Sequence, residues 1–159
     1  LNNISSFSKE TIYELRDTIW AMNKEEITIE DLKTRISNFI DNAQLSLNGI
    51  RFNFNFDTKS FQSFSSRDGM NIYRLIQEAV NNSVKYSDGN EIVVKVSDVD
   101  NQIEIKINDN GKGFDLETTD FGNGLHNMKK RIEEVNGKFE IQSKPNQGTT
   151  ITVLLPKNK

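Results

Sequence analysis

The hydrophobic pattern of this chain changes its period at Ile50, and that change restricts the possible folds more than any other feature. Before Ile50, apolar residues recur every three or four positions, as they do along one side of a helix. After Ile50, apolar and polar residues alternate over Phe52, Phe54 and Phe56, which is the two-residue period of a half-buried strand. The sequence therefore predicts a helical pair over about residues 5–48, broken at 23–28, and then a strand. The helical stripes are Ile12, Leu15, Ile19 and Met22, then Ile29, Leu32, Ile36, Phe39, Ile40, Ala43 and Leu47.

The order of the remaining elements predicts an α+β fold. The strands come in adjacent pairs and do not alternate strictly with helices, which argues against a doubly wound nucleotide-binding fold. We expect a two-layer sandwich in which helices cover one face of a mixed, mainly antiparallel sheet, preceded by a helical segment. Helices are expected at 68–86 and 125–135, and strands at 92–96, 103–107, 138–142 and 150–155.

Composition excludes several classes of protein. The 159 residues suffice for one domain with a core, and the absence of cysteine excludes disulfides and thiolate metal sites. The net charge of −3 and the dispersed lysines predict no nucleic-acid partner. No apolar run reaches the ~20 residues that span a bilayer, and a cytoplasmic location is expected. Because the first residue is Leu1, we expect a fragment, whose parent protein can still be anchored in the inner membrane.

The helix expected at 68–86 carries the first group of chemically capable side chains. Glu78 and Asn82 are four residues apart and share a helix face, and Lys85 and Tyr86 extend that stripe away from the apolar face. A carboxylate, an amide and an ammonium group in a row suit a phosphate bound through Mg²⁺, which takes hard oxygen ligands and keeps several waters. A solvated helix face explains the same residues, and for this helix alone that interpretation is favoured.

Three glycine-containing segments follow, and each has a purely structural alternative. In "NDNGKGFD", Asp109 ends a strand and can accept an amino hydrogen, with Gly111 and Gly113 beside it, although a β-turn has the same composition. In "GNGLHNMKKR", Gly122 and Gly124 lead into a helix whose first N–H groups make a natural phosphate site, although a plain loop is equally simple. The third segment, "NQGTT" at 146–150, also suits an ordinary turn.

Taken together and in this order, the segments resemble the ATP-binding domain of histidine kinases. The resemblance extends to the wider group that includes DNA gyrase B, the Hsp90 chaperones and the mismatch-repair protein MutL. "QEAVNNSVKY" at 77–86 resembles the asparagine box, "DNGKG" at 109–113 the first glycine box, and "GNGL" at 122–125 the second. The similarity covers roughly residues 50–157 and implies a Bergerat-type fold.

A second resemblance concerns the start of the chain. "LRDTIWAMN" at 15–23 is similar to the sensor kinases of the nitrate- and desaturase-sensing branch, in which it lies between the dimerisation helices and the ATP domain. It implies that residues 1–49 are a helical remnant of the dimerisation and phosphotransfer stalk with its connector, and that residues 50–159 are the ATP-binding catalytic domain.

The family resemblance implies a role for each matching position. Glu78 would take a proton from the phosphoacceptor histidine, and Asn82 would bind Mg²⁺. Asp109 would recognise the adenine of ATP. The segment from Asp115 to Asn123, too polar to belong to the core, would form a lid that orders when nucleotide binds. The remaining implied contacts to ATP are Lys85, Tyr86, Gly111, Gly113, Gly122, Gly124, Leu125 and Thr149.

The implied activity is transfer of the γ-phosphoryl group of Mg-ATP to a histidine outside this chain. The chain's one histidine, His126, lies inside the second glycine box, so we do not expect the fragment to phosphorylate itself. The expected partners are the parent's own phosphoacceptor helices, a downstream response regulator and a second copy of the parent. Two alternatives remain open: a serine protein kinase of the anti-sigma type, against which "LRDTIWAMN" argues, and a non-catalytic ATP-gated binding module, against which Glu78 argues.

Overall fold

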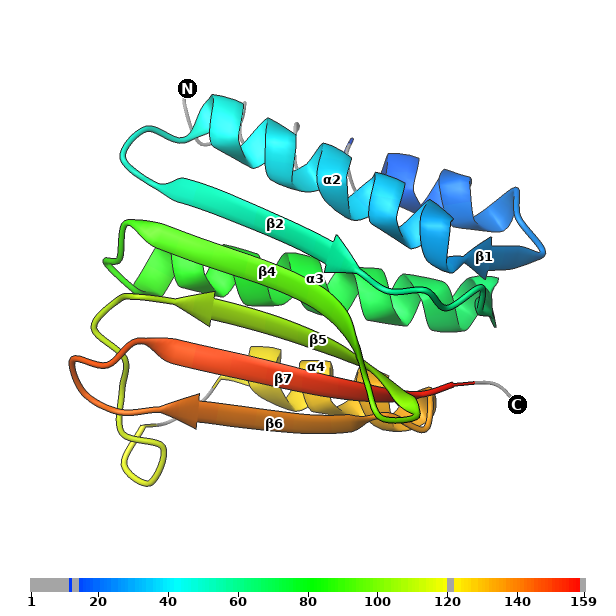
Figure 1. Cartoon of the computed structure of the whole chain (residues 1–159). Helices are drawn as coiled ribbons and strands as arrows, with labels where there is room; N and C mark the ends of the chain where they lie inside the picture. Colours follow the sequence, from blue (N-terminus) through cyan, green and yellow to red (C-terminus); the bar gives the residue numbers. More distant parts are fainter. Residues whose placement is uncertain (1–11, 13–14, 120–121, 158–159) are drawn as a thin grey trace.

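A five-stranded sheet covered on one face by helices forms the body of the protein (Figure 1). The computed structural model describes residues 12, 15–119 and 122–157. The part of the first predicted helix before residue 12 therefore lies outside the described residues. After a helical segment at 15–22, the elements are β1 (Glu26–Thr28), α2 (Ile29–Ser46), β2 (Arg51–Asp57), β3 (Ser63–Ser65), α3 (Ser66–Tyr86), β4 (Glu91–Val99), β5 (Gln102–Asp109), α4 (Asn123–Glu134), β6 (Lys138–Ser143) and β7 (Thr149–Pro156).

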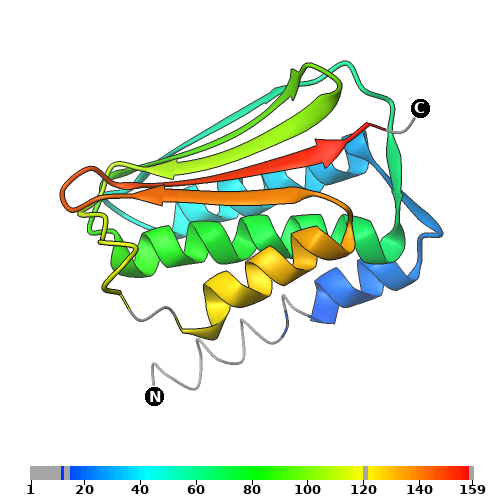
Figure 2. The same cartoon turned by 90° about the horizontal axis from the view of Figure 1, so that it is seen from below.

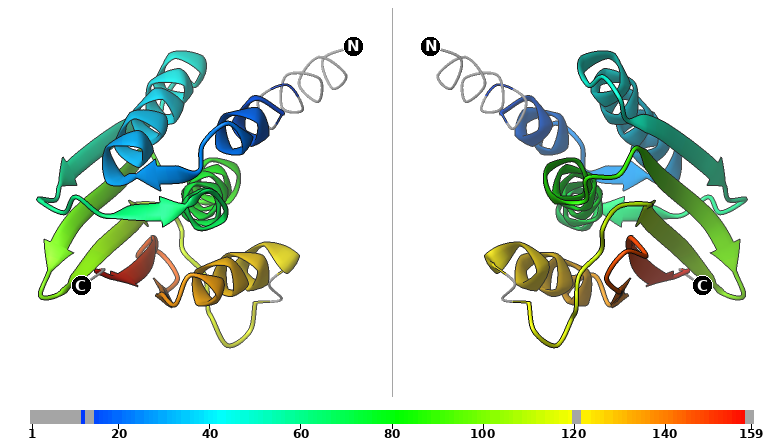
Figure 3. Two further views of the ribbon diagram at one scale, coloured as in Figure 1. Left: turned by 90° about the vertical axis from the view of Figure 1, so that its right-hand side faces the viewer. Right: turned by 90° about the vertical axis from the view of Figure 1, so that its left-hand side faces the viewer.

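The strands of the main sheet lie in the order β2-β4-β5-β7-β6. Only β2 and β4 pair in parallel, while the three other pairings are antiparallel. A parallel pair needs a long crossover, and α3 lies within the connection that supplies it. The predicted fold class, a mixed and mainly antiparallel sheet with helices on one face and a helical segment before it, is confirmed. End-on views show α2, α3 and α4 on the same side of the sheet (Figure 3).

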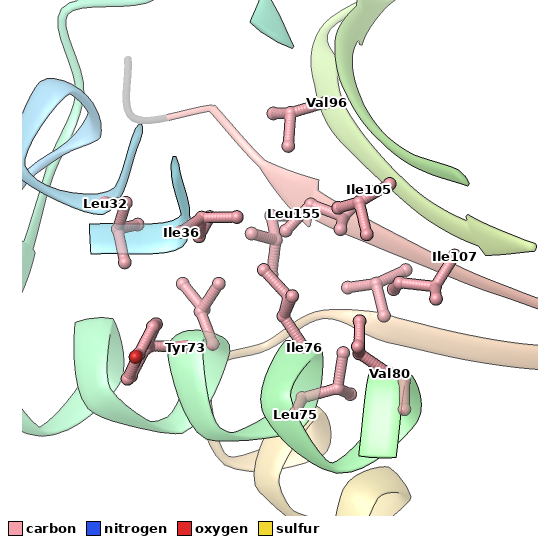
Figure 4. Close-up of a cluster of buried hydrophobic side chains, with 14 of the residues drawn as sticks. Leu32, Ile36, Tyr73, Leu75, Ile76, Val80, Val96, Ile105, Ile107 and Leu155 are labelled. Carbon is pink, nitrogen blue, oxygen red and sulfur yellow. The ribbon is translucent and has the colours of Figure 1, made fainter. Parts of the chain in front are cut away.

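The core lies between this sheet and the helices. Alternate residues of the three central strands point into it, as the two-residue period requires. Ile76 and Val80 from α3 meet Ile105 and Leu155 from the sheet, and none of the four is more than 3% exposed (Figure 4). Burying each such side chain contributes about 1.5–3 kcal/mol, so α3 is anchored along its length by the apolar stripe that its sequence carries.

The helix starts follow capping rules. The Thr28 hydroxyl accepts from the backbone N–H of Asp31, and the Asp31 carboxylate accepts from the N–H of Thr28, which together make a capping box. Ser65 caps α3 by accepting from the N–H of Asp68. Gly122 at the start of α4 has no side chain for such a cap, which leaves the first N–H groups of that helix for another partner.

Two short strands were not predicted from the sequence. The segment predicted as a polar break contains β1, which pairs with β3 in a separate two-stranded sheet. Ile27 in β1 is fully buried, and a Cβ on Gly69 would lie only 2.7 Å from the Ile27 Cβ. Three-residue strands are too short for a periodic signal. The burial of Ile27 depends on its close contact with Gly69 of α3, which the sequence alone does not reveal.

Helix α2 shares its buried core with the rest of the protein. Ile29, Leu32, Ile36 and Ile40 of α2 belong to the same buried cluster as the residues of α3 and the sheet. The functional division of the chain between residues 49 and 50 stays a prediction. Within the described residues, no helix is both long and apolar enough to cross a membrane.

Candidate active site

A cavity of about 650 Å³ opens where the second half of α3, the end of β5 and the start of α4 meet. Figure 2 shows α3 and α4 side by side beneath the sheet, with the segment that follows β5 at the same end. The volume lies within the ~300–1,000 Å³ typical of small-molecule sites. The lining residues are Glu78, Ala79, Asn82, Ser83, Tyr86, Ser87, Asp109, Lys112, Gly113, Phe114, Thr119, Gly122, Asn123, Gly124, Leu125, Ile141, Thr149 and Ile151.

All but two of the residues singled out from the sequence line this cavity. Lys85 does not; it is exposed in the last turn of α3, where a cation interacts favourably with the helix dipole. Gly111 does not line the cavity either. A Cβ at this position would come within 2.2 Å of the Ser87 carbonyl oxygen. Gly111 therefore allows the loop after β5 to approach the end of α3.

Asp109 is a buried carboxylate in the cavity lining. It is 3% exposed at the end of β5. Its Oδ2 accepts from the Ser83 hydroxyl at 2.8 Å, and its Oδ1 accepts from the Gly111 N–H at 2.9 Å. Since a carboxylate has about four lone-pair sites, two remain for a further donor. The sequence did not predict a role for Ser83. A serine on the inward face of a helix shows no function until its hydrogen-bond partner, here Asp109, is known.

Apolar side chains complete this part of the cavity. Ala79 of α3, Ile141 of β6 and Ile151 of β7 belong to its lining, and Phe114 follows the glycine loop. A buried acceptor among apolar walls suits a flat heteroaromatic ring that carries an amino group. The sequence had indicated the acceptor but not these walls, which come from three separate elements.

Two glycines let the loops around Asp109 interlock. Gly113 and Gly148 have φ values of +56° and +71°, and a Cβ on either would lie 2.1 Å from a carbonyl oxygen, that of Lys144 or of Asp109. Their positive φ is accessible to glycine at little cost. Gly148 was not predicted from the sequence, because its role depends on a contact with Asp109, 39 residues earlier in the chain.

Another part of the cavity lining joins Glu78 and Asn82 to the start of α4. A Cβ on Gly124 would lie 2.9 Å from the Glu78 Oε1 and 3.8 Å from the Asn82 Nδ2, so a side chain there would displace the carboxylate. The uncapped N–H groups of the first turn and the positive end of the α4 dipole therefore lie beside these two side chains. This combination can hold an anion together with a cation.

A metal here would need few protein ligands. The described residues contain no group of three or more His, Asp or Glu side chains placed to hold a metal ion. Mg²⁺ accepts one or two protein oxygens together with phosphate oxygens and water. The Asn82 amide and the nearby Glu78 carboxylate fit that requirement, and a zinc-type cage does not.

The segment after Asp115 begins with a hydrogen-bonded turn. The Asp115 carboxylate accepts from the N–H of Glu117 at 2.9 Å, and its carbonyl accepts from the N–H of Thr119 at 3.1 Å. Thr119 and Gly122 line the cavity on either side of residues 120–121, which lie outside the described residues. The predicted lid from Asp115 to Asn123 includes these two residues.

His126 is exposed on α4 and is not among the residues that line the cavity. It follows Leu125, which does line it. An acceptor must approach the reacting phosphorus closely and in line, so this position gives no support to a role for His126 as the phosphoacceptor.

The comparisons with known proteins agree on one family. The family described as "Histidine kinase-, DNA gyrase B-, and HSP90-like ATPase" matches residues 67–159. An uncharacterized sensor-like histidine kinase of Chloroflexus aurantiacus is 28% identical over 98% of this chain and 27% of its own length. The signal transduction histidine-protein kinase/phosphatase DegS of Brevibacillus brevis is 29% identical over 98% of this chain and 40% of its own length. This chain thus spans less than half of either relative.

Solved structures share the fold at lower identity. The histidine kinase AdeS of Acinetobacter baumannii superposes with a TM-score of 0.68 and 17% identity, over 99% of this chain and 82% of that one. The histidine kinase domain of a blue-light activated histidine kinase from Erythrobacter litoralis superposes with a TM-score of 0.63 and 13% identity, over 80% and 60% of the two chains. At these identities the likeness concerns the fold alone.

Proposed function

We propose, from the premise that this chain belongs to the family of histidine kinase-, DNA gyrase B- and HSP90-like ATPases, that its cavity binds Mg-ATP for phosphoryl transfer to a histidine. The observation that carries the proposal is that Asp109 and the Glu78–Asn82 pair line one cavity, each with a different set of neighbours. A nucleotide has complementary ends, with an amino-bearing ring at one and a chain of phosphates at the other.

The adenine would lie against Asp109. Its amino group would donate to a free lone pair of the carboxylate, while the ring would pack on the apolar lining of Ala79, Ile141 and Ile151. Thr149, Gly111 and Gly113 would support this end through the loops that hold Asp109. Tyr86, at the end of α3, would contact the ribose.

The phosphates would lie between α3 and the start of α4. The free N–H groups of the first turn of α4 and its dipole favour negative charge. Asn82 would provide an amide oxygen for Mg²⁺, which neutralises phosphate charge when bound. Lys85 is exposed outside the cavity and would reach the phosphates only through its long side chain, whereas Lys112 already lines the cavity.

Glu78 would act as the base. Its carboxylate would take the N–H proton from the acceptor imidazole, leaving the other ring nitrogen to attack the γ-phosphorus as the bond to ADP breaks. The acceptor histidine would lie on the parent's dimerisation helices. A response regulator would receive the phosphoryl group in turn, the parent would act as a homodimer, and the reaction would take place in the cytoplasm.

Isothermal titration calorimetry with a non-hydrolysable ATP analogue tests the binding proposal. We expect saturable binding that is stronger with Mg²⁺ than with EDTA, because the cation would link the phosphates to the Asn82 amide oxygen. Absence of binding at millimolar analogue in both conditions would refute it. If the analogue binds, analysis of the phosphorylated product separates the alternatives: phosphoserine would indicate an anti-sigma-type kinase, and no product with any acceptor would indicate an ATP-gated binding module.

Ser83→Ala is expected to weaken binding of the ATP analogue by about 5–30-fold. The change removes one of the two donors that hold Asp109, and a hydrogen bond to a charged group contributes roughly 1.5–3 kcal/mol, part of which water can replace. Ser83→Thr keeps the hydroxyl and serves as the control. Equal affinities of Ser83→Ala and the wild type would show that Gly111 alone orients the carboxylate.

The segment from Asp115 to Asn123 is expected to gain protection from hydrogen exchange when the ATP analogue binds. It borders the cavity through Thr119 and Gly122, and lids of this kind commonly close over bound substrate. Amides in β5 are the internal control, because the sheet should be protected in both states. Strong protection of 115–119 without nucleotide would contradict the lid.

A further inference from the structure

The buried carboxylate of Asp17 joins the N-terminal helix at 15–22 to helices α2 and α3. Asp17 is 6% exposed. One of its oxygens pairs with the Arg35 guanidinium of α2, and the other accepts from the Gln77 Nε2 of α3 at 3.0 Å. A second link runs from the Arg74 guanidinium of α3 to the Thr18 hydroxyl at 3.3 Å. These polar contacts attach the helix to the rest of the protein, beside the apolar contacts of Trp20 and Ala21 with the core.

Arg35 depends on Asp17 for its charge balance. Its guanidinium lies 5.2 Å from the ring centroid of Trp20 and 5.8 Å from that of Tyr73. Its Nε is buried and has no hydrogen-bond partner among the described residues. Burial, and next the charge of Asp17, raise the pKa of the Tyr73 hydroxyl, which stays protonated and accepts from Gln77 at 3.1 Å. Without Asp17, a partly buried cation would remain among aromatic rings.

The other side of the same helix is apolar and faces water. Ile12, Leu15, Ile19 and Met22 are between 50% and 79% exposed. In an ordinary surface helix the apolar stripe packs inward. Trp20 and Ala21 of this helix pack on the core, but its main apolar stripe faces out. The apolar pattern alone therefore does not fix the helix on the domain, and the polar contacts of Asp17 select its orientation.

This attachment lies next to the proposed base. Gln77, which binds Asp17, directly precedes Glu78, which lines the cavity. Successive side chains on a helix point about 100° apart, so one turn of α3 presents Gln77 to the N-terminal helix and Glu78 to the cavity. Figure 3 shows the described part of the N-terminal helix beside α3, on the side away from the sheet.

We propose that Asp17, Arg35 and Gln77 form a polar lock that fixes the N-terminal helix on α3 and so sets the geometry between that helix and Glu78. Asp17 is a positioning residue in this arrangement: it touches no substrate and acts through Gln77 and α3. The role assigned to Glu78 rests on the proposed function, whereas the lock itself does not. The lock should govern the rate of phosphoryl transfer and leave nucleotide affinity unchanged.

Asp17→Asn tests the lock in this chain without nucleotide. Trp20 is the only tryptophan, so its emission reports directly on the helix. We expect a shift of that emission to longer wavelength and hydrogen exchange of amides 15–22 that is roughly 10–100-fold faster, the range for loss of a charged hydrogen bond. Asp41→Asn, an exposed carboxylate on α2, is the matched control and should change neither. Wild-type emission and exchange in Asp17→Asn would overturn the proposal.

Two further variants keep the test decisive. Asp17→Asn combined with Arg35→Gln removes both charges, so it should recover much of the protection that the single variant loses. Gln77→Ala removes one link without stranding a charge and should loosen the helix less, which provides a readout if Asp17→Asn does not fold. No recovery in the double variant, with Gln77→Ala identical to wild type, would rule out the lock.

The positioning role is measured in the full-length parent protein. Asp17→Asn should change the maximal rate of autophosphorylation at least several-fold, with the dissociation constant of the ATP analogue unchanged and the double variant closer to wild type. A released helix with an unchanged rate would overturn the positioning role. If the wild-type chain binds no nucleotide, the proposed function fails, yet the exchange and emission results still decide whether the lock exists.

Discussion

Glu78→Gln is expected to lower phosphoryl transfer to histidine by about 10²–10⁴-fold, the range for loss of a general base. Glutamine keeps the size of the side chain and can still contact the start of α4 near Gly124, but it cannot accept a proton. Affinity for Mg-ATP should change little, since the ring and phosphate contacts remain. The measurement is transfer of radiolabel from ATP to an acceptor-helix fragment of the parent, supplied separately.

The matched control for this variant is Glu133→Gln, an exposed carboxylate on α4 that pairs with Lys129. It should transfer at the wild-type rate. Undiminished transfer by Glu78→Gln would remove Glu78 from the mechanism and leave positioning and charge neutralisation as the whole of catalysis. Acid-labile label on this chain itself, lost in His126→Ala, would instead make His126 an acceptor.

Asp109→Asn is expected to weaken binding of the ATP analogue by roughly 1.5–3 kcal/mol, which is about 10–150-fold. The amide has one oxygen where the carboxylate has two, and that oxygen cannot serve Ser83, Gly111 and adenine equally well. The amide nitrogen would also bring a donor toward the donor group of the ring. Calorimetry with Mg²⁺ present measures the loss.

Asp100→Asn is a fair control, because Asp100 lies in the exposed turn between β4 and β5 with φ +52°, a conformation that asparagine tolerates. It should bind the analogue as the wild type does. Thermal unfolding of both variants separates lost affinity from lost stability. Wild-type affinity in a folded Asp109→Asn would refute adenine recognition by this residue.

The long elements were predictable because each carries its own period. The helix containing Glu78 and the strands that flank Asp109 have apolar faces wide enough to place them within a few residues of the observed bounds. The order of those elements was enough to predict the fold class. The glycine-containing segments, together with the helix that contains Glu78, include many of the residues that line the cavity. Strands β1 and β3 were missed, since three residues provide no period and Ile27 is apolar alone in a polar stretch.

The sequence by itself identified residues that line one cavity: a carboxylate and an amide one turn apart on a helix, an aspartate at a strand end, and glycines in the loops beside them. These depend on residues near one another in the chain. Only the tertiary structure decided that Ser83 holds Asp109, that Gly148 lies against the Asp109 carbonyl, and that Asp17 bridges two helices. Each of these contacts joins residues between 18 and 60 positions apart, and polar contacts at such separations leave no periodic trace in the sequence.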